Sequence, residues 1–141
     1  PKFLVWASAD SLGAPLQRIQ IIKGWLENGK HKEKVFDVVC SDGLMVDSSN
    51  FRCPDNGAKV NIETCEITQN LGASELKSFW EDPDFLKDQE AFYYVRVLEN
   101  PVCRWSTWDS IRAGFKPRSD IPATIQERAW TSPIWFEPVN S

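Results

Sequence analysis

The sequence has few of the residues on which most enzyme sites depend. It contains a single histidine, His31, in a polar turn among lysines, and it has no Cys-x-x-Cys pair. A serine or cysteine nucleophile normally requires a nearby base, and there is no second histidine to supply one. Zinc sites are built from closely spaced pairs of ligands, which the four separated cysteines do not provide. We therefore predict neither acyl transfer nor zinc binding.

Sequence signals for phosphate, membrane and nucleic-acid binding are also missing. Gly57 and Gly72 are isolated, so they do not form a glycine-rich phosphate loop. No apolar run approaches the roughly 20 residues of a membrane-spanning helix. The net charge is −4, whereas nucleic-acid-binding proteins carry basic stripes. We therefore expect no nucleic acid and no membrane among the partners of this chain.

Carboxylates are abundant, but their arrangement indicates no site. Asp42, Asp47 and Asp55 lie in a turn-rich stretch, and their spacing does not match the alternate ligand positions of an EF-hand loop. A pair of carboxylates can hydrolyse a glycosidic bond, yet among 20 Asp and Glu residues no pair stands out. We expect no catalytic residue, no metal ligand and no cofactor within this chain.

Alternating large apolar side chains are the strongest positive signal. In the segment 92–98 they alternate between two apolar faces, as expected of a central strand. Asn28-Gly29 is a strong hairpin signal, so residues 17–40 should form a β-hairpin. Further strands are expected at 3–7, 44–46, 60–67 and 128–136, the last with an edge or bulge at Pro133.

Two short segments are typical of helices. In 72–80 the apolar residues would share one helix face. The segment 107–113 directly follows Ser106, and Ser106 and Asp109 have the spacing of a capping box. Gly114 would end this helix. These elements predict an all-β fold, a β-sandwich of about six to seven mostly antiparallel strands with two short helical insertions. A partly open β-barrel is the alternative.

The length and the start of the chain bear on its domain organisation. At 141 residues it is long enough for one domain. It begins at Pro1 and enters a strand almost at once, which is abrupt for a natural N-terminus. We therefore interpret residues 1–141 as a single β-sandwich domain that is a fragment or a processed product of a longer protein.

The four cysteines are best interpreted as two disulfides. Cys40 and Cys53 lie at the two ends of a polar loop, where a disulfide would be most useful because it closes a flexible loop. If these two pair, Cys65 and Cys103 would form the second disulfide. Four cysteines allow three pairings, however, and the sequence does not choose among them. Free thiols in a cytosolic protein remain an alternative. Disulfides would indicate an oxidising compartment, and so an exported protein.

The best candidate site is a cluster rich in tryptophan and arginine. Arginine can stack on tryptophan and can bind a carboxylate or phosphate through two hydrogen bonds. A second acidic and basic pair, near the last strand, could complete the site. We interpret the cluster as a ligand or inter-domain contact, the alternative being that the tryptophans pack the end of the sandwich. The candidate residues are Arg104, Trp105, Trp108, Asp109, Glu127 and Arg128.

Four long motifs resemble a known protein family. They are Leu-Gln-Arg-Ile-Gln-Ile-Ile-Lys-Gly-Trp at 16–25, Ala-Phe-Tyr-Tyr-Val-Arg-Val-Leu-Glu-Asn-Pro at 91–101, Arg-Trp-Ser-Thr-Trp-Asp at 104–109 and Gln-Glu-Arg-Ala-Trp-Thr-Ser-Pro-Ile-Trp at 126–135. Together they resemble the C-terminal part of the domain-of-unknown-function 3604 family. The resemblance implies a β-sandwich appended to an upstream region that is similar to metal-dependent phosphoesterases of the polymerase-and-histidinol-phosphatase type. Any divalent metal would belong to that upstream region.

Two functions from different classes are consistent with these observations. The first is a non-catalytic C-terminal domain that docks onto the N-terminal domain of the same, hydrolase-like protein, with the 104–109 loop bordering its active site. The second is a binding module that takes a sugar or another small molecule on exposed tryptophans. A coplanar exposed row of rings would favour the second function, and an apolar patch would favour the first.

Overall fold

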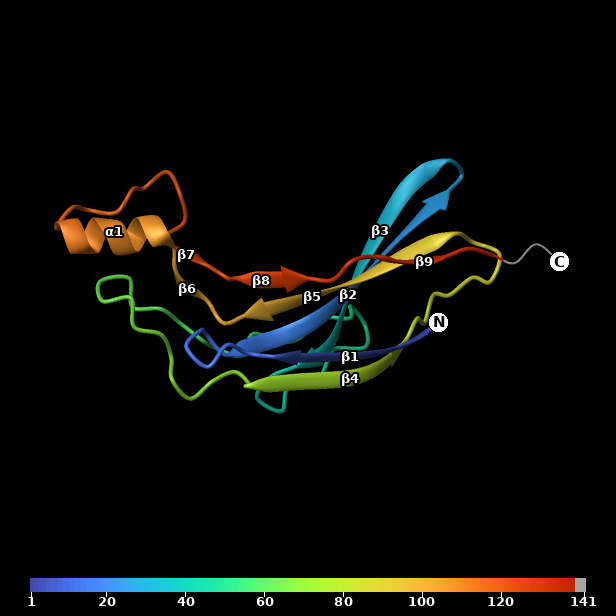
Figure 1. Ribbon diagram of the computed structural model, residues 1–141, viewed down its shortest axis with the longest axis horizontal. Coiled ribbons are helices and arrows are strands. Elements are labelled where there is room, and N and C mark those ends of the chain that lie inside the picture. The colour runs from blue at the N-terminus through green and yellow to red at the C-terminus, as the bar shows by residue number, and fades with distance from the viewer. Residues whose placement is uncertain (139–141) are drawn as a thin grey trace.

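Two antiparallel sheets lie face to face in the computed structural model, which describes residues 1–138 (Figure 1). The larger sheet has the strand order β3-β2-β5-β8, with β9 also paired to β5, and the smaller sheet consists of β1 and β4. The short strands β6 and β7 form a separate antiparallel pair. This arrangement confirms the predicted all-β sandwich, and the described residues form no closed barrel. The strands are β1 (Lys2–Ser8), β2 (Leu16–Glu27), β3 (Lys30–Cys40), β4 (Glu75–Glu81), β5 (Ala91–Glu99), β6 (Val102–Cys103), β7 (Thr124–Ile125), β8 (Arg128–Trp130) and β9 (Ile134–Phe136), and the helix is α1 (Trp105–Ala113).

The β2–β3 hairpin is the longest pairing in the molecule. Its turn is formed by Asn28 and Gly29, whose φ angles are 52° and 72°. Positive φ at both central residues is the backbone that an Asn-Gly hairpin turn requires. The predicted hairpin is therefore confirmed, and so is β5, which pairs with β2 over almost its whole length.

The core lies between the two sheets. Val5 and Leu76 from the smaller sheet pack against Ile19, Ile21 and Tyr93 from the larger one. Each of these side chains is almost completely buried, and burying one large apolar side chain stabilises the fold by about 1.5–3 kcal/mol.

The prediction of a helix at 72–80 is wrong, because this segment contains β4. Leu76 and Trp80 are four residues apart, a spacing that places them on one face of a helix and of a strand alike. The segment forms a strand because it pairs with β1, with Phe79 directly opposite Leu4. Tertiary pairing therefore overrides an ambiguous local pattern.

The connection between β3 and β4 is also less regular than predicted. The segment 60–67 closes with an isolated bridge between Val60 and Ile67 instead of forming a strand, and 44–46 forms no strand. The last predicted strand is split into β8 and β9, with Pro133 between them, and both parts pair with β5. Proline lacks the N–H group that a continuous ladder of strand hydrogen bonds needs, so the interruption agrees with the edge or bulge predicted at Pro133.

The predicted helix near residue 107 is confirmed as α1, and so is its end at Gly114, but the capping box predicted at its start is wrong. Gly114 ends the helix in the left-handed conformation and donates its N–H to the carbonyl of Ile111. The N-cap residue is Arg104, and no side chain caps the first turn. Among residues 1–138, no helix has the length and apolar character needed to cross a membrane.

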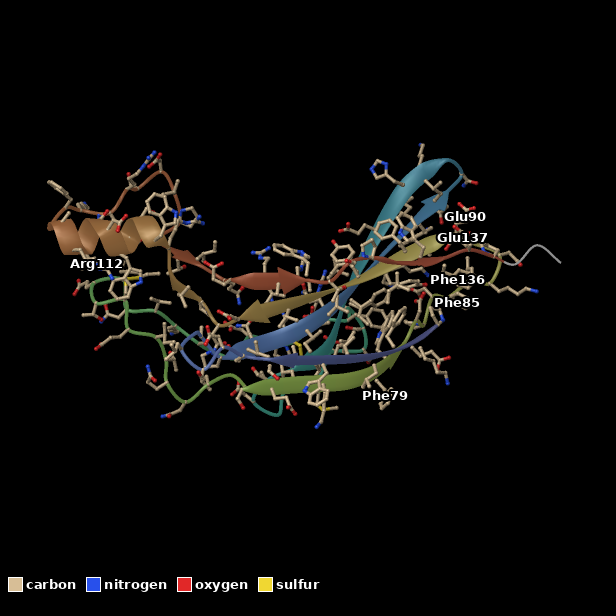
Figure 2. All side chains as sticks on the ribbon, viewed as in Figure 1. Phe79, Phe85, Glu90, Arg112, Phe136 and Glu137 are labelled. Atoms are coloured by element: carbon tan, nitrogen blue, oxygen red, sulfur yellow. A yellow bond between two sulfur atoms is a disulfide. The ribbon has the colours of Figure 1, made fainter. Side chains whose placement is uncertain are left out.

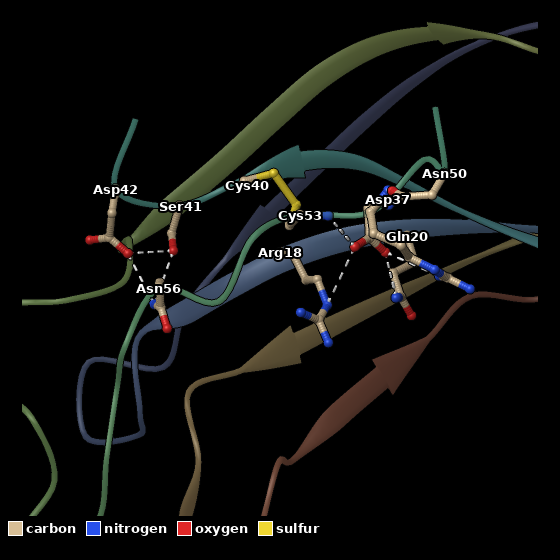
Figure 3. The surroundings of a disulfide bond; sticks show 10 residues. Arg18, Gln20, Asp37, Cys40, Ser41, Asp42, Asn50, Cys53 and Asn56 are labelled. Carbon is tan, nitrogen blue, oxygen red and sulfur yellow. Dashed lines mark hydrogen bonds and ion pairs between the residues drawn. A yellow bond between two sulfur atoms is a disulfide. The ribbon is translucent and has the colours of Figure 1, made fainter. Parts of the chain in front are cut away.

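Two disulfides attach the long β3–β4 connection to the rest of the molecule. Cys40 pairs with Cys53 (Figure 3), and Cys65 pairs with Cys103. The Cα–Cα distances are 5.7 and 5.5 Å. The described residues contain no free cysteine, so the predicted cross-links are confirmed. Disulfides of this kind are typical of oxidising compartments.

Candidate functional site

The segment 104–109 forms the start of α1, at one end of the molecule (Figure 1). Arg104 donates its Nε–H to the carbonyl of Pro122 and its backbone N–H to the carbonyl of Ala123, at 3.0 and 2.9 Å. Trp105 is 74% exposed and Trp108 is 38% exposed. The segment is therefore fixed by main-chain carbonyls and presents an aromatic ring to solvent.

The two tryptophan rings of α1 differ in their surroundings. The guanidinium of Arg112, the residue labelled on the helix in Figure 2, lies 5.3 Å from the ring centroid of Trp108. No ring contact joins Trp105 to Trp108 in the part of the chain that the structure describes. Asp109, the remaining candidate on this helix, is exposed.

Glu127 and Arg128 lie elsewhere, at the start of β8. No hydrogen bond or ion pair within residues 1–138 joins either of them to 104–109, so direct polar contacts do not link the six candidate residues. Both line a pocket of about 250 Å³ beside Glu99. Burial, together with the nearby carboxylates of Glu127 and Asp10, raises the pKa of Glu99.

Two other clusters lie on the outer face, meaning the side of the larger sheet that is turned away from β1 and β4. Since side chains alternate along a strand, residues one position away from the core point to this face. Cross-strand register brings residues of β2, β3, β5, β8 and β9 together there. The outer face carries Arg18, Gln20, Gly24, Asp37, Phe92, Tyr94, Arg96, Trp130 and Trp135.

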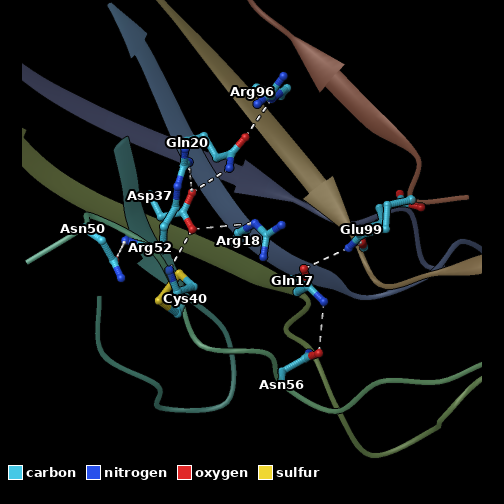
Figure 4. Close-up of polar contacts among 12 residues, drawn as sticks. Gln17, Arg18, Gln20, Asp37, Cys40, Asn50, Arg52, Asn56, Arg96 and Glu99 are labelled. Atoms are coloured by element: carbon cyan, nitrogen blue, oxygen red, sulfur yellow. Dashed lines mark hydrogen bonds and ion pairs between the residues drawn. A yellow bond between two sulfur atoms is a disulfide. The ribbon is translucent and has the colours of Figure 1, made fainter. Parts of the chain in front are cut away.

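The first cluster is polar and is centred on Asp37, whose side chain is 1% exposed (Figure 4). Asp37 accepts hydrogen bonds from Gln20 Nε2 at 2.6 Å and from the backbone N–H of Cys53 at 2.7 Å. Gln20 accepts a bond of 2.7 Å from Arg96. The network fixes the loop beside the Cys40–Cys53 disulfide to the larger sheet. The hydrogen bonds from Gln20 and Cys53 satisfy the buried carboxylate of Asp37.

Next to this network lies a pocket of about 560 Å³, lined by Arg18, Asp55 and Gln126 among others. The Nε atom of Arg18 is buried 3.8 Å from Asp37 and has no hydrogen-bond partner among the described residues. Gln126 donates to Gln17 at 2.8 Å. The pocket thus contains one cation whose Nε is unpartnered and amides that already have partners, and the described residues of its lining show no nucleophile hydrogen-bonded to a base.

The second cluster is aromatic and lies at the opposite end of the outer face. The rings of Phe92 and Tyr94 are stacked, with centroids 6.4 Å apart and planes 11° apart. Trp135 packs against Phe92 at 5.2 Å with a tilt of 49°. A pocket of about 250 Å³ opens beside this pair. Sequence reasoning missed this site because it depends on the register between β5 and β9.

A buried ion pair lies between the sheets. Lys23 Nζ is 2.7 Å from Asp82 Oδ2, and the Tyr93 hydroxyl donates to the same oxygen at 2.8 Å. Burial opposes ionisation of Asp82, but hydrogen bonds from Lys23 and Tyr93 outweigh it and hold the pKa of this carboxyl below its ordinary value. Burial and the Asp82 carboxylate raise the pKa of Tyr93. This triad ties the residue that follows β4 to β2 and β5.

The smaller sheet carries an exposed apolar surface, which we term the β1–β4 patch and which consists of Leu4, Trp6 and Phe79. Leu4 lies directly opposite Phe79 in the register, and Trp6 follows on the same face of β1. These three side chains are between 61% and 82% exposed. Contiguous exposed apolar surface of this kind marks interaction sites in soluble proteins.

Within residues 1–138, no three His, Cys, Asp or Glu side chains are placed to hold a metal ion together. No curated protein and no solved structure matches the sequence. The family model described as "Protein of unknown function (DUF3604)" matches residues 1–138. This match covers almost the whole chain, including all the strands of both sheets, and it agrees with the motifs in β2, β5 and α1. The chain belongs to the DUF3604 family of proteins of unknown function.

Proposed function

We propose that this chain is a non-catalytic β-sandwich domain that docks onto the catalytic domain of a larger, metal-dependent hydrolase. The resemblance of the family's upstream region to metal-dependent phosphoesterases supports a hydrolase as the parent protein. Under this proposal the divalent metal and the catalytic side chains belong to the other domain. The present chain stabilises that domain and presents residues at the edge of its active site.

The β1–β4 patch is the observation that supports docking most strongly. Its apolar centre is flanked by two exposed ion pairs, Lys2 with Glu81 and Lys77 with Glu75, each at 3.3 Å. An apolar centre within a polar rim is the usual composition of a protein interface. Exposed tryptophan also contributes strongly to binding when it becomes buried in an interface. The proposed occupant of the patch is the hydrolase domain of the same protein.

The start of α1 is the proposed second contact. Its segment 104–109 is held by the carbonyls of Pro122 and Ala123, so the exposed ring of Trp105 projects from a fixed backbone. A rigid exposed aromatic side chain loses little conformational entropy when it is buried. We place this segment at the border of the parent active site.

Binding of a sugar on exposed tryptophans is the alternative proposal, and the geometry supports it less. Trp105 and Trp108 differ in exposure, and the ring of Trp108 has a guanidinium 5.3 Å from its centre. Sugar stacking needs an open ring face. The arrangement at α1 therefore fits a protein contact better than a sugar platform.

Export of the protein to the periplasm or the cell exterior forms part of the same proposal. It is supported by the two disulfides, because such bonds persist mainly in oxidising compartments.

A hydrolase assay with added divalent metals tests the proposal. The purified chain is expected to show no turnover of phosphoester substrates, whereas the full-length protein is expected to be active. Turnover by the chain alone that Glu127→Gln abolishes would overturn the proposal, because Glu127 would then be a catalytic group of this domain. Asp109→Asn is the matched control, since Asp109 is also an exposed carboxylate.

A further inference from the structure

The aromatic pocket of the outer face is built on one transverse row of the larger sheet. Glu33 of β3 lies opposite Gly24 of β2, Gly24 lies opposite Phe92 of β5, and Phe92 lies opposite Trp135 of β9. The row therefore crosses four strands and ends in a carboxylate on one side and an indole on the other. All four residues line the same pocket of about 250 Å³.

Gly24 determines the shape of the pocket floor. A Cβ atom at this position would lie 2.2 Å from Cζ of Phe92, so the ring occupies the space that any other side chain would fill. The tip of the Phe92 ring thus lies directly over Gly24. Trp135 rises beside it at a tilt of 49°, with the two centroids 5.2 Å apart. The two rings form a corner, which suits a compact rounded group better than a flat sugar ring.

Three carboxylates surround this aromatic corner. Glu33, Glu90 and Glu137 line the pocket, and Glu90 and Glu137 lie near each other at its edge (Figure 2). None of these three carboxylates forms a salt bridge within residues 1–138. The one lysine in the lining, Lys32, is already 3.8 Å from Glu27. The pocket therefore combines π faces with an excess of negative charge.

This combination selects a class of ligand. Aromatic faces attract cations through the ring quadrupole, and the attraction is strongest when the cation is weakly hydrated. An inorganic divalent cation requires several oxygen ligands in place of its water shell, and no three His, Cys, Asp or Glu side chains of the described residues are placed to supply them together. We propose that this pocket binds a small organic ammonium ion, with its alkyl groups in the corner of Phe92 and Trp135 and its charge facing the carboxylates. The proposal is independent of the docking role.

Calorimetric titration of the intact protein with choline and with its neutral isostere 3,3-dimethylbutan-1-ol tests the proposal. The two probes have the same shape and differ in charge. Choline is expected to bind about tenfold more tightly than the alcohol, which corresponds to a cation–π and carboxylate contribution near 1.4 kcal/mol. Tetramethylammonium is expected to bind like choline.

Two sets of variants assign the binding to this pocket. Trp135→Ala is expected to weaken choline binding about tenfold or more. Glu90→Gln combined with Glu137→Gln is expected to reduce the preference for choline over the alcohol several-fold. Trp130→Ala and Glu63→Gln are the matched controls and should leave binding unchanged, because both residues are exposed and lie outside the pocket.

Equal binding of choline and the alcohol would overturn the proposal and would identify the pocket as a purely apolar groove. Absence of choline binding to a correctly folded protein, or choline binding that Trp135→Ala leaves unchanged, would overturn it as well. Circular dichroism verifies the fold of each variant. Trp135 is 68% exposed, so its removal is not expected to disturb the core.

Discussion

Lys23 and Asp82 form an ion pair of 2.7 Å between side chains that are 2% and 0% exposed. Removing one partner leaves the other charge buried without compensation, which typically costs about 3–5 kcal/mol. Asp82→Ala is therefore expected to lower the free energy of unfolding by about that amount in a denaturant titration. The double variant Lys23→Met with Asp82→Leu should be much less destabilised than either single variant. A double variant as unstable as the sum of the singles would contradict this account.

The same pair makes stability depend on pH in the acid range. Hydrogen bonds from Lys23 and Tyr93 hold the pKa of Asp82 below its ordinary value of 3.8. The contribution of this carboxylate is therefore fully present above the unfolded-state pKa, and it is lost as the pH falls through the lower, folded-state pKa. In thermal melts across this pH range, the melting temperature of the natural protein should fall more steeply with decreasing pH than that of Asp82→Asn. Identical acid profiles would rule out this contribution.

The two disulfides are expected to contribute unequally to stability. Cys40–Cys53 spans 13 residues and Cys65–Cys103 spans 38. The chain-entropy model gives about 3 kcal/mol for the shorter loop and about 4 kcal/mol for the longer one. Replacing Cys65 and Cys103 by serine should therefore lower the unfolding free energy more than replacing the other pair. Mass spectrometry before and after reduction supplies the control, with an expected gain of four hydrogens; no gain would exclude both cross-links.

Gly24 and Phe92 should be energetically coupled. Gly24→Ala places a methyl group in the space of the Phe92 ring, and such overpacking typically costs about 1–3 kcal/mol. In a Phe92→Ala background the same substitution should cost much less, because the ring is gone. A double-mutant cycle on unfolding free energies measures this coupling. Additive effects of the two substitutions would mean that the ring does not lie over the glycine.

Part of this fold could be predicted from the sequence because the signal was local. The Asn28-Gly29 turn requires two positive φ angles, and few dipeptides adopt them readily. β5 was predicted correctly because both of its faces are apolar. The segment containing β4 was predicted wrongly because Leu76 and Trp80 fit a helix and a strand equally well. Only the presence of β1 as a pairing partner distinguishes the two.

The candidate site was predicted less well, for a related reason. Arg104, Trp105, Trp108 and Asp109 lie together because they are neighbours in the sequence. The aromatic pocket joins Gly24 to Trp135, which are more than a hundred residues apart. Its formation depends on two cross-strand registers, which sequence spacing alone does not reveal.

Hydroxyl-radical footprinting of the isolated chain and of the full-length protein tests the docking proposal most directly. In the isolated chain, Trp6 and Phe79 should be readily oxidised, since they are 66% and 82% exposed. In the full-length protein we predict strong protection of both residues and of Trp105, with Trp130 oxidised equally in the two samples. Equal oxidation of Trp6 and Phe79 in both proteins would contradict the proposal that this surface docks onto a catalytic domain.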